Sequence, residues 1–218
     1  KVEEYFHNRL NVVKVLPGYE VNEKTLENID YILSTVPLKN IASDKIIKIN
    51  RMLQKEDVEN IENKIFHKET TELLEIATFF NKDNFYIGKN FETKEECINF
   101  LADEAIKKGL MNNNAKMSIF EREEMSSTSI GDLVAIPHPI YNECGTSFIS
   151  ILILNKPIIW DDLFVQVVFL LNVEKGKMNL WEPMFLKLYN YIKLKNGVNS
   201  ILKNKSYEVF INEFEKMF

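Results

Sequence analysis

Hydrophobic residues in the first third of the chain fall alternately at strand-like and helical spacings. A helical spacing marks residues 55–67, where Val58, Ile61 and Ile65 would share one face of a helix. Residues 22–28 predict a second, shorter helix. Short runs rich in β-branched residues, bounded by proline or polar turns, predict strands at 11–16, 30–36 and 45–50. Strands that alternate with helices indicate a parallel α/β unit.

The pattern is interrupted at residues 68–90, which we interpret as a partly helical link followed by a polar stretch. Thr93, with Glu96 three residues later, is typical of a capped helix N-terminus, and Gly109 marks the end of that helix. Further strands are predicted at 132–137, 147–154 and 164–171, and further helices at 117–125, 180–193, 198–203 and 206–217. Because the run 147–154 is apolar throughout, we expect it to be buried on both faces of a sheet.

The composition narrows the possible functions. The 218 residues are enough for one large or two small domains, each with a core. The net charge of −5 disfavours a dominant nucleic-acid surface, and the longest apolar runs are too short to span a bilayer. The charged first residues predict no signal peptide.

The cysteine and histidine content carries further expectations. The two cysteines, Cys97 and Cys144, lie far apart in sequence, which indicates a reducing cytoplasm as the setting. Histidine, cysteine and carboxylate residues do not cluster at metal-ligand spacing, so we expect no metal site. No motif predicts a cofactor.

One of the three histidines stands in the sequence Pro137-His138-Pro139, directly after the apolar run 133–136. Pro137 fixes φ and removes a backbone donor, and Pro139 restricts His138 to extended conformations. A histidine on a stiff backbone at the end of a strand, where open α/β sheets place their chemistry, suits an oriented nucleophile. Neutral imidazole can accept a phosphoryl group near pH 7. The alternative is a buried histidine whose hydrogen bonds are satisfied by its neighbours.

The residues before this histidine extend the pattern. Residues 121–138 read EREEMSSTSIGDLVAIPH. This stretch resembles the active-site signature of the type-2 EIIA proteins of the bacterial phosphoenolpyruvate:sugar phosphotransferase system. There, an Arg-Glu pair, a Ser-Thr pair and a glycine precede an apolar strand that ends in Pro-His. The resemblance extends over about residues 70–218 and implies an α/β domain with a mixed central sheet flanked by helices. It also implies that His138 accepts a phosphoryl group from the carrier protein HPr.

The resemblance implies roles for three further residues. Arg122 would supply a planar cation to the transferred group, and Ser127 and Thr128 would supply hydroxyl or backbone donors. The alternatives are a surface ion pair of Arg122 with Glu123 or Glu124, and an ordinary turn at the end of a helix for Ser127 and Thr128.

Asn179 marks a departure from the family. Members that transport sugar usually carry a second histidine at the start of a late helix, near the position of Asn179 in this chain. An amide can hydrogen-bond an imidazole or a phosphoryl oxygen, but it cannot transfer a proton. Ser129, Leu133 and Pro139 also replace common glycines, so we expect the loop before the strand to be less open. The missing histidine fits a sensor better than a turnover enzyme.

The first part of the chain resembles a second family. Residues 30–38 (DYILSTVPL), with the segment KIIKINRMLQKEDVENIENKI that follows, are similar to the second half of a galactitol-type EIIB domain. We therefore interpret residues 1–68 as an EIIB-like domain without its N-terminal strand and phosphate loop, and residues 69–218 as the EIIA-like domain. EIIB domains are phosphorylated on a cysteine of that loop, which Cys97 does not match. EIIB followed directly by EIIA resembles the C-terminal part of PRD-containing transcription regulators, such as mannitol-operon and lichenan-operon activators and antiterminators.

Three functions remain open at this point. The leading hypothesis is a regulatory module of a sugar-responsive bacterial activator or antiterminator, phosphorylated on His138 by phospho-HPr. The second is an EIIA/EIIB component of a sugar transporter that passes phosphate from HPr to sugar. The third is an interaction module whose histidine is not phosphorylated. The leading hypothesis predicts HPr and a cognate EIIB as partners, contact with DNA or RNA only through domains outside these residues, no membrane insertion, and a homodimer.

Overall fold

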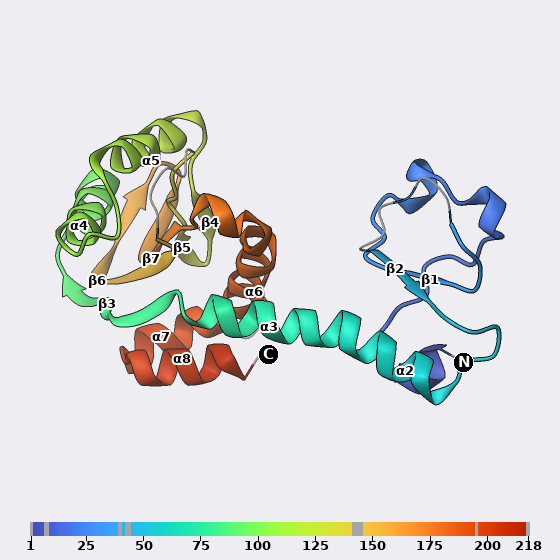
Figure 1. Ribbon diagram of the computed structural model, residues 1–218. Coiled ribbons are helices and arrows are strands. Elements are labelled where there is room, and N and C mark those ends of the chain that lie inside the picture. The colour runs from blue at the N-terminus through green and yellow to red at the C-terminus, as the bar shows by residue number, and fades with distance from the viewer. Residues whose placement is uncertain are drawn as a thin grey trace. The chain divides into compact units, whose positions relative to one another are not determined.

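The computed structural model describes residues 2–6, 9–38, 41, 45–140, 146–194 and 196–216. The chain divides into two compact units, Lys1–Thr71 and Glu72–Phe218, and the boundary falls within helix α3 (His67–Ala77) (Figure 1). Each unit packs around apolar side chains of its own. Within the described ranges, no helix combines the length and the apolar character needed to cross a membrane.

The second unit is built on a mixed sheet with helices on both faces, which confirms the predicted architecture (Figure 1). Its described strands are β3 (Phe80–Lys89), β4 (Ser129–Gly131), β5 (Leu133–Ala135), β6 (Phe148–Trp160) and β7 (Leu163–Asn172). Their order across the sheet is β3-β6-β7-β5-β4. The pairs β3–β6 and β5–β7 are parallel, whereas β6–β7 and β4–β5 are antiparallel.

The alternation of side chains along β6 divides the core into two layers. Ile149, Ile151 and Ile153 pack against the C-terminal helices, and Leu152 and Leu154 pack on the opposite face of the sheet. The opposite face is covered by α4 (Lys94–Lys107) and α5 (Asn113–Met125), and the first face by α6 (Trp181–Leu194), α7 (Gly197–Asn204) and α8 (Tyr207–Glu215). Residues 148–154 are all buried, which confirms that this strand is enclosed on both faces.

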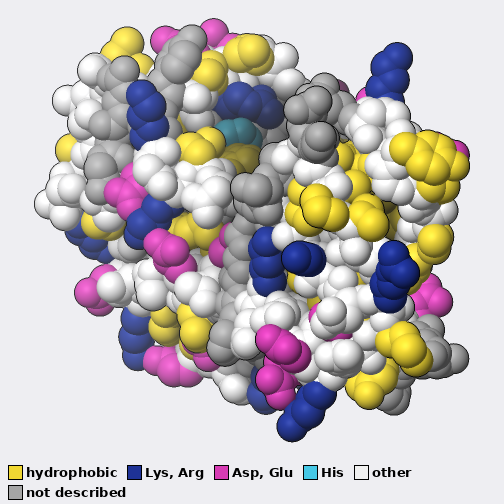
Figure 2. All heavy atoms as spheres, turned by 45° about the vertical axis from the view of Figure 1, so that its right-hand side comes forward, with side chains coloured by type: hydrophobic (Ala, Val, Ile, Leu, Met, Phe, Trp, Pro, Cys, Tyr) yellow, Lys and Arg dark blue, Asp and Glu magenta, His cyan; other side chains and the backbone are white. Residues whose placement is uncertain are grey.

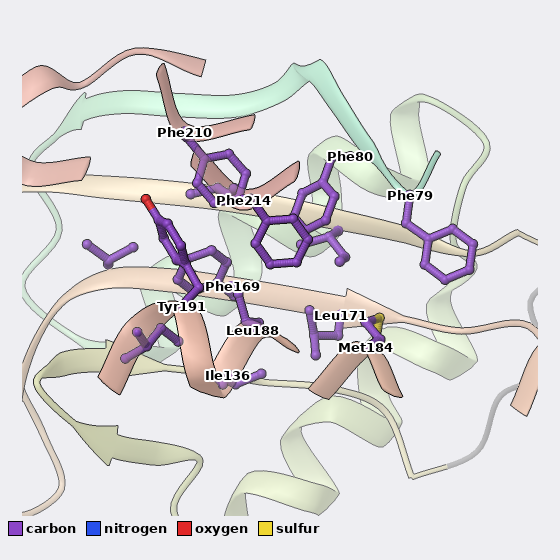
Figure 3. Packing of buried hydrophobic residues seen from close by; sticks show 14 of the residues in the cluster. Phe79, Phe80, Ile136, Phe169, Leu171, Met184, Leu188, Tyr191, Phe210 and Phe214 are labelled. Atoms are coloured by element: carbon purple, nitrogen blue, oxygen red, sulfur yellow. The ribbon is translucent and has the colours of Figure 1, made fainter. Parts of the chain in front are cut away.

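Aromatic side chains pack among aliphatic ones in the layer beneath α6 to α8 (Figure 3). The Phe80 and Phe214 ring centroids lie 4.9 Å apart, and those of Tyr191 and Phe210 lie 5.5 Å apart in an edge-to-face arrangement that such rings favour. Gly197 lies so close to Tyr191 that an added Cβ would stand 2.4 Å from the ring atom Cε1. The start of α7 therefore has no room for a side chain.

Four boundaries in the second unit differ from the sequence-based prediction. The stretch predicted to be a polar link contains the ten-residue strand β3, which borders only β6 among the described strands. Most of its polar residues are exposed, although Asn84 is buried. Helix α5 begins earlier than residue 117, because Asn112 caps it through Ala115 N–H. Strand β5 is shorter than 132–137: a turn occupies Asp132, and the strand begins at Leu133, both residues having positive φ (50° and 64°). Strand β6 continues past Pro157 through a register shift between Ile153 and Ile158.

The first unit is a smaller α/β arrangement. Strands β1 (Ile32–Ser34) and β2 (Ile46–Lys48) pair in parallel, as predicted. The predicted helix at 55–67 is present as α2 (Lys55–Ile61), a π-helical segment η4 (Glu62–Phe66) and the beginning of α3. The other helices described are α1 (Val2–Phe6) and the 3₁₀ turns η1 (Gly18–Glu20) and η2 (Glu23–Leu26). One apolar cluster holds the unit together, with Phe6, Ile47, Ile61 and Ile65 at its centre.

The strand predicted at residues 11–16 is wrong. These residues form no regular element, and Val13 and Val15 are 59% and 88% exposed. Among the described residues β1 and β2 pair only with each other, so the segment lacks the neighbouring strand that a β-branched run needs.

Candidate functional site

His138 lies three residues beyond the carboxyl end of β5, where two hydrogen bonds and two prolines constrain the backbone. The carbonyl of Pro137 accepts a hydrogen bond from Leu171 N–H of β7 at 3.1 Å. Ile140 N–H donates to Ser118 Oγ of α5 at 2.8 Å. Prolines on both sides of His138 restrict the remaining backbone freedom. The segment is therefore rigid without belonging to a strand.

Only one of the two ring nitrogens of His138, Nδ1, lies against the carbonyl of Ile136. Nδ1 lies 2.9 Å from the carbonyl oxygen of Ile136. A carbonyl can only accept, so Nδ1 carries the proton and Nε2 keeps its lone pair. Burial lowers the pKa of His138 below its ordinary value of 6.5, and the nearby Arg122 cation lowers it further. The neutral imidazole is therefore the dominant form near pH 7.

A hollow of about 340 Å³ opens at His138. Figure 2 shows the histidine side chain (cyan) set back between hydrophobic (yellow) and basic (dark blue) side chains. The ring of Trp181 lies 5.0 Å from that of His138, centroid to centroid. The hollow is lined by Arg122, Met125, His138, Pro139, Ile140, Met178 and Trp181. It thus combines one cation, one nucleophilic nitrogen and an apolar rim.

Arg122 reaches the hollow from the last turn of α5. Its Nη1 donates to the carbonyl of Ser126 at 2.9 Å, which places the guanidinium at the negative end of the helix. The carboxylate of Glu123 makes its hydrogen bonds with other groups. Of the residues suggested by the sequence, the structure brings Arg122 and His138 together.

The other three predicted residues do not line the hollow among the described residues. Ser127 Oγ lies 2.9 Å from Ser129 Oγ and also hydrogen-bonds Asp161. Thr128 is buried, and both its N–H and its hydroxyl donate to Glu123. Asn179 is exposed in the 3₁₀ segment η5 (Lys175–Leu180), between the lining residues Met178 and Trp181. These positions suit support of the loop and the rim more than direct contact with His138.

Sequence reasoning missed the importance of Glu123. Its side chain is only 5% exposed and lies directly behind the site. Its Oε1 accepts from Thr128 N–H at 3.0 Å and from Trp160 Nε1–H at 2.7 Å, and its Oε2 accepts from the Thr128 hydroxyl at 2.5 Å. A signal was present, because Ala115, Ile119 and Glu123 follow each other at four-residue intervals, which puts the carboxylate on the buried face of α5.

Other candidate chemistry is weak in the described part of the chain. No group of three or more metal-ligating side chains gathers within these residues. Burial raises the pKa of the Cys97 thiol to about 12, and Glu96 and Glu95 add to the shift, so this cysteine is a poor nucleophile. Cys144 and His7 lie outside the described residues.

Comparison with known proteins relates the chain to one protein family and to two regulators. Residues 78–217 match the family described as "Phosphoenolpyruvate-dependent sugar phosphotransferase system, EIIA 2". The chain is 31% identical over 216 residues to the "Probable licABCH operon regulator" of Bacillus subtilis (strain 168), covering 99% of this chain and 33% of that protein. It is 22% identical to the "Transcriptional regulator ManR" of the same organism, covering 99% of this chain and 34% of that protein. The chain thus spans about a third of the length of these relatives.

A solved structure supports the fold. The complex of enzyme IIA-Mtl and phosphorylated enzyme IIB-Mtl from Escherichia coli aligns with a TM-score of 0.55 at 15% identity, covering 63% of this chain and 97% of that one. Such a likeness bears on architecture alone. The sequence match, by contrast, extends over well more than half of the chain and includes the whole segment that carries His138. The chain therefore belongs to the EIIA 2 family of the phosphoenolpyruvate-dependent sugar phosphotransferase system.

Proposed function

We propose that this chain is the regulatory phosphotransferase-system part of a sugar-responsive bacterial transcription regulator, and that His138 accepts a phosphoryl group from phospho-HPr. The observation that carries the proposal is a neutral imidazole whose Nε2 has no hydrogen-bond partner among the described residues, held in a hollow beside the Arg122 guanidinium. A phosphoryl acceptor needs an available lone pair and a cation for the charge of the transferred group.

In the proposed transfer, one N–P bond forms as another breaks, and no proton has to move. The Nε2 lone pair of His138 forms the new N–P bond as the N–P bond of the donor phosphohistidine breaks. The electron pair of the broken bond returns to the donor imidazole. Nδ1 keeps its proton and its bond to the Ile136 carbonyl throughout, which disperses the positive charge that the ring gains when phosphorylated.

Arg122 acts in this proposal through its planar cation. Charge in a phosphoryl-transfer transition state is spread over three oxygens, and a guanidinium can donate to two of them at once. Ser127 and Thr128 stay predicted contributors, with Thr128 in a supporting role because both of its donors are engaged by Glu123. Asn179 could hydrogen-bond a phosphoryl oxygen, but its amide cannot carry a proton onward. A site that receives phosphate without a second histidine fits a sensor.

The regulatory assignment draws on the two relatives that align along 99% of this chain, both of which are named as regulators. In the proposal, phosphorylation of His138 reports sugar supply to DNA- or RNA-binding and PRD domains outside these residues. The regulator would act as a homodimer.

We also propose that residues 1–68 are an EIIB-like domain. The parallel pair β1–β2 and helix α2, which follows β2, agree with one α/β layer of such a domain. A generic α/β layer is the alternative. In this proposal the chain's partners are HPr and a cognate EIIB.

The test of the proposed function is transfer of labelled phosphate from phosphoenolpyruvate, enzyme I and HPr onto the 218-residue chain. Wild type should become labelled and His138→Ala should not. A matched control replaces the other two histidines, His7 and His67, and should be labelled like wild type. Equal labelling of wild type and His138→Ala, or none on wild type, would overturn the assignment of His138.

The transporter alternative makes a different prediction. A working EIIA domain passes its phosphate to the cysteine of a cognate EIIB, whereas a sensor keeps it until HPr takes it back. Chasing the labelled chain with purified EIIB domains separates the two. Rapid discharge onto an EIIB cysteine would favour the transporter, and discharge onto unphosphorylated HPr alone would favour the regulator.

A further inference from the structure

Glu123 connects the site to the centre of the sheet. Its carboxylate receives three hydrogen bonds, one from Trp160 at the end of β6 and two from Thr128 in the turn after α5. A buried carboxylate is costly without such partners. Because both donor residues are buried, the carboxylate joins the turn to β6 out of contact with solvent.

The hydrogen bonds continue from Thr128 to the imidazole. The Thr128 carbonyl accepts from Ile136 N–H at 3.0 Å, and the Ile136 carbonyl accepts from His138 Nδ1–H at 2.9 Å. The peptide before Ile136 is therefore fixed by Thr128, and the Pro137 carbonyl is fixed by Leu171 of β7. The direction of the Ile136 carbonyl depends on both anchors.

We infer that Glu123, anchored by Trp160, is a positioning residue for His138: it fixes Thr128 and through it the Ile136 carbonyl, which holds the imidazole as the Nδ1–H tautomer and leaves the lone pair on Nε2. The adjacent residues Arg122 and Glu123 thus serve one site from two sides. The guanidinium faces the hollow, and the carboxylate supports its back wall. The expected effect on the rate of phosphorylation rests on the proposed function. The tautomer of His138 can be measured whether or not the chain is phosphorylated.

A merely structural role for Glu123 is the competing explanation. In that case its loss would reduce stability, but molecules that remain folded would keep an unchanged His138. A positioning role predicts instead that folded molecules lose their tautomer preference. ¹⁵N NMR of the His138 ring nitrogens, which reports the tautomer, distinguishes the two explanations.

The experiment compares three variants of the 218-residue chain. Glu123→Leu removes every acceptor. Glu123→Gln keeps an acceptor oxygen for Trp160 and the Thr128 N–H, while the Thr128 hydroxyl can accept from the new amide. Glu124→Gln is the matched control, because Glu124 is the exposed neighbour on the same helix. The readouts are the His138 tautomer, its pKa, and kcat and KM for phosphorylation by phospho-HPr.

We expect Glu123→Leu to give a mixture of tautomers and a kcat lower by about tenfold to a hundredfold, with KM changed by less than about twofold. Glu123→Gln should keep the Nδ1–H tautomer and a kcat within about threefold of wild type. Its His138 pKa should fall, because the negative charge of Glu123 raises that pKa. Glu124→Gln should match wild type in all readouts.

A folded Glu123→Leu that retains the Nδ1–H tautomer and wild-type kcat would overturn the inference. If that variant does not fold, the double variant Trp160→Phe with Thr128→Val takes its place, since it leaves the carboxylate with the Thr128 N–H alone. An unchanged tautomer in the double variant would overturn the inference equally. If wild type accepts no phosphate, the proposed function fails, and the tautomer measurement alone decides the role of Glu123.

Discussion

The two units of the chain differ in how much of their structure is enclosed. In the second unit, helices cover both faces of the sheet and two apolar layers fill the space between. In the first unit, two three-residue strands share a single apolar cluster, and residues 11–20 are exposed throughout. The second unit, which contains the match to the EIIA 2 family, also surrounds its candidate site with buried hydrogen bonds. An enclosed core thus supplies the packing that can hold a side chain in one position, and the first unit has less of it.

Truncating a fully buried side chain in either unit should cause the largest loss of stability. Phe169→Ala in the second unit should cost about 3–5 kcal/mol, and Ile61→Ala in the first about 2–5 kcal/mol, because each empties a fully buried position. Each change should accelerate amide hydrogen exchange in its own unit and leave the other unit's slowest amides unchanged. If Phe169→Ala accelerates exchange in β1 and β2 as strongly as in β6, the two cores are one cooperative unit and the comparison fails.

Replacing one glycine in each unit should have effects of intermediate size on stability, and the two effects should differ. Gly197→Ala should destabilise the second unit by about 1–3 kcal/mol, because the new Cβ would overlap the buried ring of Tyr191. Gly18→Ala in the first unit should change stability by less than about 0.5 kcal/mol, since its new Cβ meets the half-exposed side chain of Val36, which can move. Urea unfolding of both variants measures the difference, and equal costs would contradict it.

The smallest effects are pH-dependent and fall in different ranges for the two units. The folded pKa of His138 lies below 6.5, so the unfolded chain binds the proton first, and the second unit loses stability as pH falls from 6.5 toward the folded pKa. The pKa of Asp57 lies below 3.8, chiefly through the hydrogen bond from Gln54 N–H. Its contribution to the first unit is present above 3.8 and is lost as pH falls through the folded value.

Unfolding at a series of pH values, followed by amide signals from each unit, measures both contributions. His138→Gln should remove the near-neutral slope from the second unit alone, and Asp57→Asn should remove the acidic slope from the first alone. A near-neutral slope that survives in His138→Gln would assign it to another group.

The parts of the fold that depend on local sequence were predictable. The helix after Thr93 followed from a capping pair within four residues, and Thr93 and Glu96 form that capping box in the structure. The rigid setting of His138 followed from its two neighbouring prolines. The strand β3 did not follow, because an edge strand mixes polar and apolar residues, and only the pairing with β6 makes it a strand.

The sequence predicted which two candidate residues come together, but not the residues that surround and support them. His138 and Arg122 belong to a recognisable motif and meet in one hollow. Glu123 lies among four charged residues in EREE, and its burial depends on Trp160, which is 37 residues away in sequence. The contact between Trp181 and His138 likewise joins segments that no local pattern relates. These contacts arise from tertiary packing between segments that are distant in sequence.

The placement of the tryptophans has a practical consequence. The chain contains two, and both adjoin the site: Trp181 lies 5.0 Å from the ring of His138, and Trp160 donates to Glu123 behind it. Indole emission is sensitive to nearby charge, so the intrinsic fluorescence of the unlabelled chain originates where phosphate would arrive. Addition of a phosphoryl group should therefore be visible as a change in emission in real time, without dye or radiolabel, and Trp160→Phe would show how much of the signal belongs to Trp181.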